Sequence, residues 1–256
     1  MTLLRFAYGF RRGVIAAALS ISALSIPGIG TAQAPAAHLD GDIGLAMVRD
    51  PAPSRGVSAR TRLWPYLFFD YGPAFVRIDT FGLRTVPMGA GSLELVGRAS
   101  RDGFDTGTPL LAGQHARRDS LPVGLGSWQE TRAGVFDVNV LRDIGPSHGW
   151  TADFTWAAQF EALGLTWYPQ LGLDHQDARY DDYYAGTVRT ATLPAWRPGG
   201  ATGRSVAMMV ERAVGRDWIA GLYLRRRWLG HAVADSPLSR GSTADSAFFE
   251  ISRRFR

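Results

Sequence analysis

The chain has 256 residues, of which 46% are hydrophobic and 20% charged, so it can hold one large β domain or two small domains. A mean hydropathy of -0.07 excludes a bundle of membrane helices but is compatible with strands whose apolar and polar faces cancel in the average. The formal charge is +5 and cysteine is absent, which excludes a disulfide framework, a thiolate metal site and a lipid-anchored lipoprotein.

Every basic residue of the chain is an arginine, because the sequence contains no lysine. Arg5, Arg11 and Arg12 lie near the N-terminus, so the rest of the chain carries only a small positive excess. The remaining arginines are spread along the sequence, apart from the run 225–227. This distribution does not form a basic patch, and we predict no nucleic-acid partner.

Residues 1–34 have the three parts of a cleaved signal peptide. The three arginines are followed by an apolar stretch from Val14 to Ile29, and small residues around Ala32 and Ala34 suit a signal peptidase. The alternative is an uncleaved membrane anchor, but the apolar stretch is shorter than the roughly 20 residues that span a bilayer and contains Pro27. We therefore expect export, with residues 35–256 as the mature domain.

The mature domain shows the period-two alternation of β-strands. In the segment from Trp150 to Phe160, the even positions are all apolar and the odd positions are small or polar. Similar alternation predicts strands at 41–48, 62–71, 74–83, 92–99, 131–141, 163–173, 183–190, 205–214, 217–229 and 247–255.

Aromatic residues near the strand ends favour a membrane barrel over a soluble β-sandwich. Trp218 and Trp228 share one face, and ten residues at about 3.3 Å, tilted by about 40°, span roughly the 25 Å between the aromatic girdles of a barrel. Arg226 interrupts this face beside Trp228, where it can snorkel to the interface. The predicted girdle consists of Trp150, Trp156, Trp167, Trp218, Trp228, Phe249 and Phe255.

The predicted fold is an all-β, transmembrane antiparallel β-barrel of the bacterial outer membrane. About eleven candidate strands are recognisable, whereas bacterial barrels of one chain have even numbers. Residues 101–130 are the least regular stretch and the expected place of a missed strand. We predict about twelve strands, with ten as the alternative. The final strand ends in Phe255 and Arg256, which resembles the sorting signal of outer-membrane barrels.

The order of several short motifs resembles the MipA/OmpV family, the MltA-interacting outer-membrane proteins. The motifs are GLA at 44–46, WPY at 64–66, LPVGLG at 121–126, YYAGT at 183–187 and ADSPL at 234–238. The resemblance covers nearly all of the mature chain. It implies a scaffold that links a murein lytic transglycosylase to a bifunctional murein synthase, and it carries no catalytic set.

No catalytic, cofactor or metal site is predicted. The five histidines, His38, His115, His148, His175 and His231, have no pair spacing that suits a metal. Outer-membrane hydrolases use a serine and a histidine, for which Ser147-His148 and Asp174-His175 are the nearest candidates. Adjacent residues of an extended chain point in opposite directions, so Ser147 and His148 are not expected to pair. Both segments are also typical of polar loops. The acidic run Asp177, Asp181 and Asp182 also reads as a loop and not as a cation site.

The predicted lumen charges are Asp153, Glu211, Arg225 and Arg227. Arginine–carboxylate pairing that closes the lumen is preferred to an open pore, because side chains nearly fill a barrel of this size. The favoured function is a non-enzymatic scaffold, in contact with outer-membrane lipid and murein enzymes. The alternatives are a narrow pore for small solutes and, less favoured, a lipid-modifying hydrolase.

Overall fold

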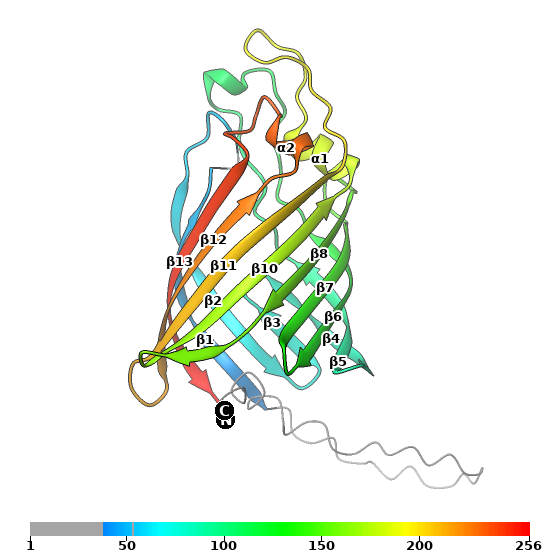
Figure 1. Ribbon diagram of the computed structural model, residues 1–256. Helices are drawn as coiled ribbons and strands as arrows, with labels where there is room; N and C mark the ends of the chain where they lie inside the picture. The colour runs from blue at the N-terminus through cyan, green and yellow to red at the C-terminus, as the bar shows by residue number, and fades with distance from the viewer. Residues whose placement is uncertain (1–37, 53) are drawn as a thin grey trace, which may run out of the picture.

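The computed structural model describes residues 38–256 except residue 53, so the expected signal peptide lies outside the described residues. The strands tilt around a common axis and form a barrel (Figure 1). They are β1 (Leu39–Asp50), β2 (Arg60–Tyr71), β3 (Ala74–Arg77), β4 (Thr80–Met88), β5 (Gly91–Arg98), β6 (Pro122–Thr131), β7 (Gly134–Asp143), β8 (Trp150–Ala157), β9 (Phe160–Ala162), β10 (Leu165–Gln176), β11 (Ala201–Ala213), β12 (Trp218–Trp228) and β13 (Thr243–Phe255). The helices are η1 (Pro109–Leu111), α1 (Ala178–Ala185) and α2 (His231–Ala234).

The strands form a closed antiparallel barrel of 12 wall strands, as the sequence predicts. Each wall strand pairs with its neighbour in the sequence, and β1 closes the ring against β13, with Gly41 opposite Phe255 and Arg49 opposite Ala247. Both β8 and β9 pair with β10, so they are two pieces of one wall strand, interrupted at residues 158 and 159.

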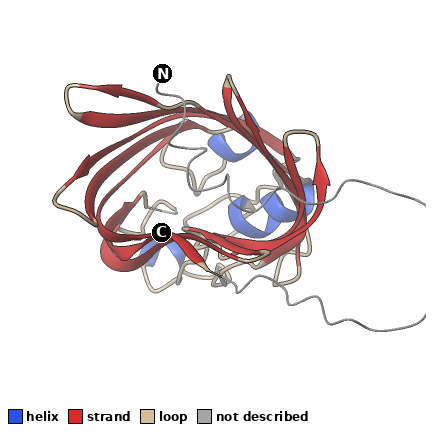
Figure 2. Cartoon of the chain, turned by 90° about the horizontal axis from the view of Figure 1, so that it is seen from below, coloured by secondary structure: helices blue, strands red, loops and turns tan. Residues whose placement is uncertain are grey.

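The two ends of the barrel differ. All three helices and the loops 51–59, 99–121, 177–200 and 229–242 lie at one end, called here the long-loop end. Tight turns, the start of β1 and the end of β13 lie at the other, the short-turn end. Seen from the short-turn end, the helices lie across the far opening of the ring (Figure 2). Within the described residues, no helix is long and apolar enough to cross a membrane.

The strand that the sequence pattern missed is β6, of which all but the last residue lies in the expected stretch 101–130. The prediction of one strand over 74–83 was wrong, because the chain reverses at Ile78 and Asp79 to form the β3–β4 hairpin. Ile78 has φ 63°. A bulky residue rarely adopts this conformation, and the turn contains neither glycine nor proline to announce it.

The prediction of a strand over 183–190 was also wrong, because most of its first half belongs to helix α1. The side chain of Asp177 caps this helix by accepting a hydrogen bond from the Tyr180 amide at 2.9 Å. The Gly186 amide donates to the carbonyl of Asp182 at the other end. A capping aspartate before the first turn satisfies an amide that the helix itself cannot, and here it outweighs the β preference of the tyrosines.

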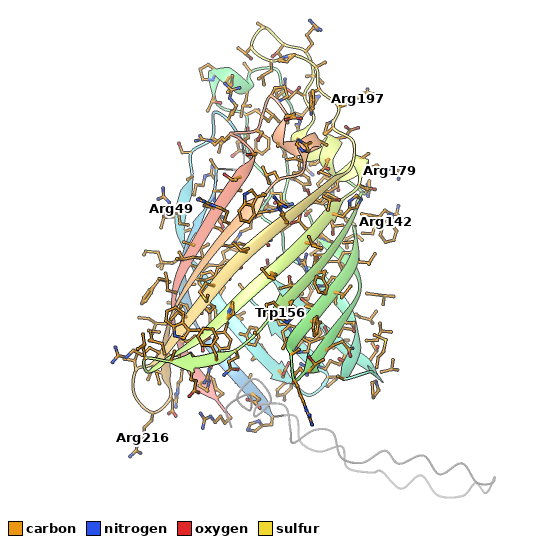
Figure 3. The ribbon with its side chains drawn as sticks, in the orientation of Figure 1. Arg49, Arg142, Trp156, Arg179, Arg197 and Arg216 are labelled. Carbon is orange, nitrogen blue, oxygen red and sulfur yellow. The ribbon has the colours of Figure 1, made fainter. Side chains whose placement is uncertain are left out.

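The wall strands present apolar side chains outward and polar ones inward. On β12, Trp218, Leu222 and Leu224 are exposed on the outer face, whereas Tyr223 and Arg225 line the interior. Many side chains project outward around the wall, with Arg49 and Arg142 nearer the long-loop end and Trp156 nearer the short-turn end (Figure 3). This is the alternation of a barrel whose exterior meets lipid and whose interior holds water.

Candidate functional site in the lumen and loop cap

The interior holds a cavity of about 2250 Å³. Its lining extends from His38 and Gly72 near the short-turn end to Arg101 and Tyr180 at the long-loop end. Side chains therefore do not fill the lumen completely, and the choice between a plugged lumen and a pore stays a prediction. All four expected lumen charges, Asp153, Glu211, Arg225 and Arg227, line this cavity.

The most enclosed ion pair of the wall joins Arg77 on β3 to Glu94 on β5. Both guanidinium NH2 groups of Arg77 donate to the carboxylate oxygens of Glu94 at 2.7 Å, and Glu94 is fully buried. The Arg77 guanidinium also lies 4.0 Å from the ring centres of both Phe75 and Trp128. Bidentate pairing together with stacking on aromatic faces is the arrangement in which arginine cannot be replaced by lysine.

Other arginine–carboxylate pairs line the lumen, but with partners that the sequence did not indicate. Arg98 donates to Asp153 at 2.6 Å, and Arg254 donates to both oxygens of Asp42 at 2.9 and 2.8 Å. Arg227 pairs with Asp174 instead of Asp153 or Glu211.

Gly203 of β11 lies between Arg227 and Asp174, and a Cβ atom there would come within 2.8 Å of an Asp174 oxygen. Among the described residues, no carboxylate pairs with Arg225, which faces the cavity as a cation.

A second group of acids lies on β11 and β13. Glu211 accepts a hydrogen bond from the Tyr168 hydroxyl at 3.2 Å and lies 3.8 Å from Arg254. Glu250 is fully buried, yet neither of its carboxylate oxygens has a hydrogen-bond partner among the described residues. A buried carboxylate without a partner is costly, so this position is an exception to the pairing found elsewhere in the wall.

The long loops pack together over the barrel and form what we call the loop cap. Its core consists of Val57, Phe104, Leu111, Leu193 and Leu238, one or two from each of the four longest loops. The amide of Arg55 donates to the Leu238 carbonyl at 2.7 Å, and the Gln114 side chain donates to the Val188 carbonyl at 2.7 Å. The four loops therefore form one hydrophobic core outside the barrel. The alternation of residues along single strands does not predict this core.

Two of the motifs that resemble the MipA/OmpV family meet in this cap. The Ser236 hydroxyl donates to the Ala185 carbonyl at 2.5 Å, which joins the segment 234–238 to the end of α1. Asp181 on α1 is buried, and one of its carboxylate oxygens has no hydrogen-bond partner among the described residues. Burial raises the pKa of Asp181 to about 8, although the charge of Arg227 lowers it. The neutral acid therefore fits this position better than the carboxylate.

The candidate catalytic and metal residues have structural partners. The Ser147 hydroxyl donates to Asp143 at 2.6 Å, so no histidine activates it, and His175 shares a hydrogen bond with Thr202 at 2.9 Å. The acidic run belongs to α1, where Asp177 is the cap. No cluster of three or more metal-ligating side chains occurs in the part of the chain that the structure describes.

The expected girdle aromatics lie on the outer face, most of them near strand ends. Trp150 and Trp228 are at the long-loop end, each with an arginine over its ring: Arg142 at 5.8 Å and Arg204 at 5.7 Å. Trp156, Trp167, Trp218 and Phe255 lie near the short-turn end. Phe249 lies in the middle of β13 between Met47 and Leu222, away from either row. That these rows mark the two membrane boundaries stays a prediction.

A closed antiparallel barrel with an apolar exterior, a charged lumen and long loops at one end defines the class of outer-membrane β-barrel proteins. Within that class, the chain belongs to the family described as MltA-interacting protein MipA, whose family model matches residues 43–255. This confirms the resemblance seen in the sequence. A comparison with curated proteins gives no match.

Proposed function

We propose that this protein is a non-enzymatic barrel of the outer membrane that serves as a scaffold for murein-remodelling enzymes. The observation that carries the proposal is membership of a family named for its interaction with MltA, a murein transglycosylase, over nearly the whole barrel. In single-chain barrels of this class the short turns face the periplasm, where murein enzymes work. We therefore assign the docking surface to the short-turn end.

Leu163 is the residue of this end best suited to contact a partner. Its side chain is 92% exposed, and it holds φ 57° in the turn between β9 and β10. A large apolar side chain that is both exposed and in the left-handed region lowers stability for two reasons, so a leucine at this position favours a binding role.

The test is a pull-down with the purified barrel in detergent, using a murein lytic transglycosylase and a bifunctional murein synthase as the probes. We expect wild type to bind the transglycosylase and Leu163→Asn to bind it about tenfold more weakly, since asparagine tolerates the backbone conformation. Ala133→Ser, in another short turn, is the matched control and should bind as wild type does. Recovery of neither enzyme with wild type would overturn the proposal.

A second candidate function is passage of small solutes, and the cavity of about 2250 Å³ with the unpaired Arg225 in its wall favours it. Planar-bilayer recordings would then show stable single-channel steps. Replacing Arg225 by serine should reduce the preference for anions, because a charge in a narrow lumen sets its selectivity. Absence of steps at any voltage would leave the scaffold as the function of the barrel.

A further inference from the structure

The barrel wall has a gap beside β2 at the long-loop end. β2 runs from Arg60 to Tyr71, but β3 pairs with it only from Phe68 to Tyr71. The chain turns back at Ile78, whose amide donates to the Leu67 carbonyl at 2.6 Å. In the described part of the chain, no strand pairs with residues 60–66 on this side, which leaves an unpaired strand edge of roughly 23 Å at about 3.3 Å per residue.

The edge that borders the gap is poorly suited to another strand. Because the Leu67 carbonyl faces β3, the backbone groups of Pro65 and Leu63 point into the gap as well. Proline has no amide hydrogen to donate, and in sheets it is confined to such unpaired edges. A peptide that added to β2 here would lose one of its ladder bonds, so strand addition is disfavoured.

The lumen wall next to the gap is apolar, unlike the charged wall elsewhere. Ala46, Val48 and Tyr66 form a buried cluster against which Trp64, Phe68, Ile78 and Phe248 pack, and all seven line the cavity. Outside the gap, Leu63 is 72% exposed on β2. Apolar side chains therefore flank the gap on both the outer face and the lumen face.

At the long-loop end of the gap, two arginines share one carboxylate. Arg62 of β2 lies 3.1 Å from Asp50, and Arg101 of the loop after β5 lies 3.3 Å from the same carboxylate. The Arg101 guanidinium also covers the Trp64 ring at 4.8 Å. The Arg62 Nε is buried without a hydrogen-bond partner among the described residues. Two guanidinium groups on one carboxylate leave a positive charge that a second anion can neutralise.

We propose that this gap is a lateral entrance for an anionic amphiphile with a single acyl chain, whose chain lies on the apolar patch and whose head group binds Arg62 and Arg101. The geometry fits this chemistry, because entry along the unpaired edge of β2 would bring a lipid tail to the apolar patch without crossing the loop cap. The proposal does not depend on the scaffold role, and its test contains no murein enzyme.

The test is calorimetric titration of the full barrel in lipid nanodiscs with a long-chain fatty acid, and with the alcohol of equal chain length as the uncharged control. We expect saturable binding of the acid, at least tenfold tighter than that of the alcohol. The double variant Arg62→Gln/Arg101→Gln should remove this difference, because the charge-assisted hydrogen bonds are lost. Equal binding of acid and alcohol by wild type would overturn the proposal.

A second measurement tests the route of entry, and the absence of native cysteine makes it simple. Leu63→Cys labelled with a bulky maleimide places an obstacle at the gap, and Leu171→Cys labelled in the same way is the control. Leu171 lies on the outer face of β10 and is 52% exposed. We expect the label at 63 to abolish binding of the fatty acid and the label at 171 to leave it unchanged. Unchanged binding with both labels would exclude the gap as the entrance.

Discussion

Two glutamates of the barrel wall, Glu94 on β5 and Glu250 on β13, are equally buried but have opposite surroundings. Glu94 is held by both NH2 groups of Arg77 at 2.7 Å, with the Arg84 Nε 3.7 Å away. Glu250 has no hydrogen-bond partner among the described residues. Its side chain lies over Gly221, where a Cβ atom would come within 2.6 Å of its Oε1.

The difference shows that depth of burial does not define the role of an acid in this wall. Glu94 joins β5 to β3, the shortest strand of the hairpin beside the gap, so its pair helps to hold that hairpin in the ring. Glu250 lies in a region where β12, β13 and β1 already pair over nearly their full lengths. We infer that Glu94 stabilises the barrel. Glu250 lowers its stability, and the long strand pairings around it offset this loss.

The largest effect is expected for Arg77→Met, which leaves Glu94 as a buried charge without its main partner. We expect the free energy of unfolding to fall by about 3–5 kcal/mol, the range for breaking a buried pair. Urea unfolding of the barrel in lipid vesicles, followed by tryptophan fluorescence, measures it. The double variant Arg77→Met/Glu94→Leu is the control and should recover most of the loss. An unchanged midpoint for the single variant would mean that Arg84 suffices for Glu94.

Replacing each of the two glutamates by glutamine is expected to have a smaller effect on the free energy of unfolding. The sign of this effect should differ between the two positions. Glu250→Gln removes an unpaired charge and should raise the free energy of unfolding by about 1 kcal/mol. Glu94→Gln weakens two charge-assisted hydrogen bonds and should lower it by about 2 kcal/mol. The same urea titration at neutral pH compares them. If both variants lose stability, Glu250 has a favourable interaction that its contacts do not reveal.

The sequence predicts the barrel well, because most wall strands carry their own alternation of residues. It does not predict which inward charges meet. Arg227 reaches Asp174 across β11, and this pairing depends on the registers of β10, β11 and β12 together. Alternation within a strand does not set these registers. A shift of the strand by two residues leaves the same side chains facing the lumen, so several registers fit the alternation equally well.

The features outside the strands were the hardest to predict. Ile78 and Asp79 form a turn that contains neither glycine nor proline, so the main signal for the gap beside β2 was Pro65, a proline within a strand. Helix α1 had a usable signal, since Asp177 precedes it as a cap and Gly186 follows it. The loop cap depends on contacts among four distant segments, which local patterns do not specify.

A third buried acid, Asp181, is expected to make the stability of the loop cap depend on pH. Its folded-state pKa is raised to about 8, so docking of the cap takes up a proton between the ordinary range of aspartate and pH 8. The stability of the cap is therefore greatest in acid, falls as the pH rises toward 8, and changes little above it. Hydrogen exchange of the 177–200 loop at pH 6 and pH 9, corrected for the intrinsic rate, should show several-fold less protection at pH 9.

Asp181→Asn separates this cause from a general effect of pH. We expect the variant to keep the same corrected protection at both pH values, because the amide cannot ionise. Asp182→Asn, at an exposed neighbouring position of α1, should retain the pH dependence of wild type. Loss of the pH dependence in both variants, or in neither, would contradict the assignment to Asp181.

The smallest effect is expected at Arg226 and Asp245 on the outer face, which repeat the bidentate geometry of Arg77 and Glu94. Their two hydrogen bonds measure 2.8 and 2.7 Å, but both side chains are 56% exposed. Exposed pairs of this kind contribute little, so Arg226→Gln should leave the urea midpoint unchanged within error.

That expectation holds only where Arg226, beside Trp228 at the long-loop end, meets water or lipid head groups. If the pair lies in the hydrocarbon region, loss of the arginine leaves Asp245 as an unpaired charge facing lipid. The resulting loss of stability grows with the depth of Asp245 in the bilayer. Arg226→Gln and Asp245→Asn, each compared with the double variant in vesicles, therefore measure how far the membrane reaches up the wall. A large loss in the single variants that the double variant restores would move the membrane boundary beyond the row of Trp150 and Trp228.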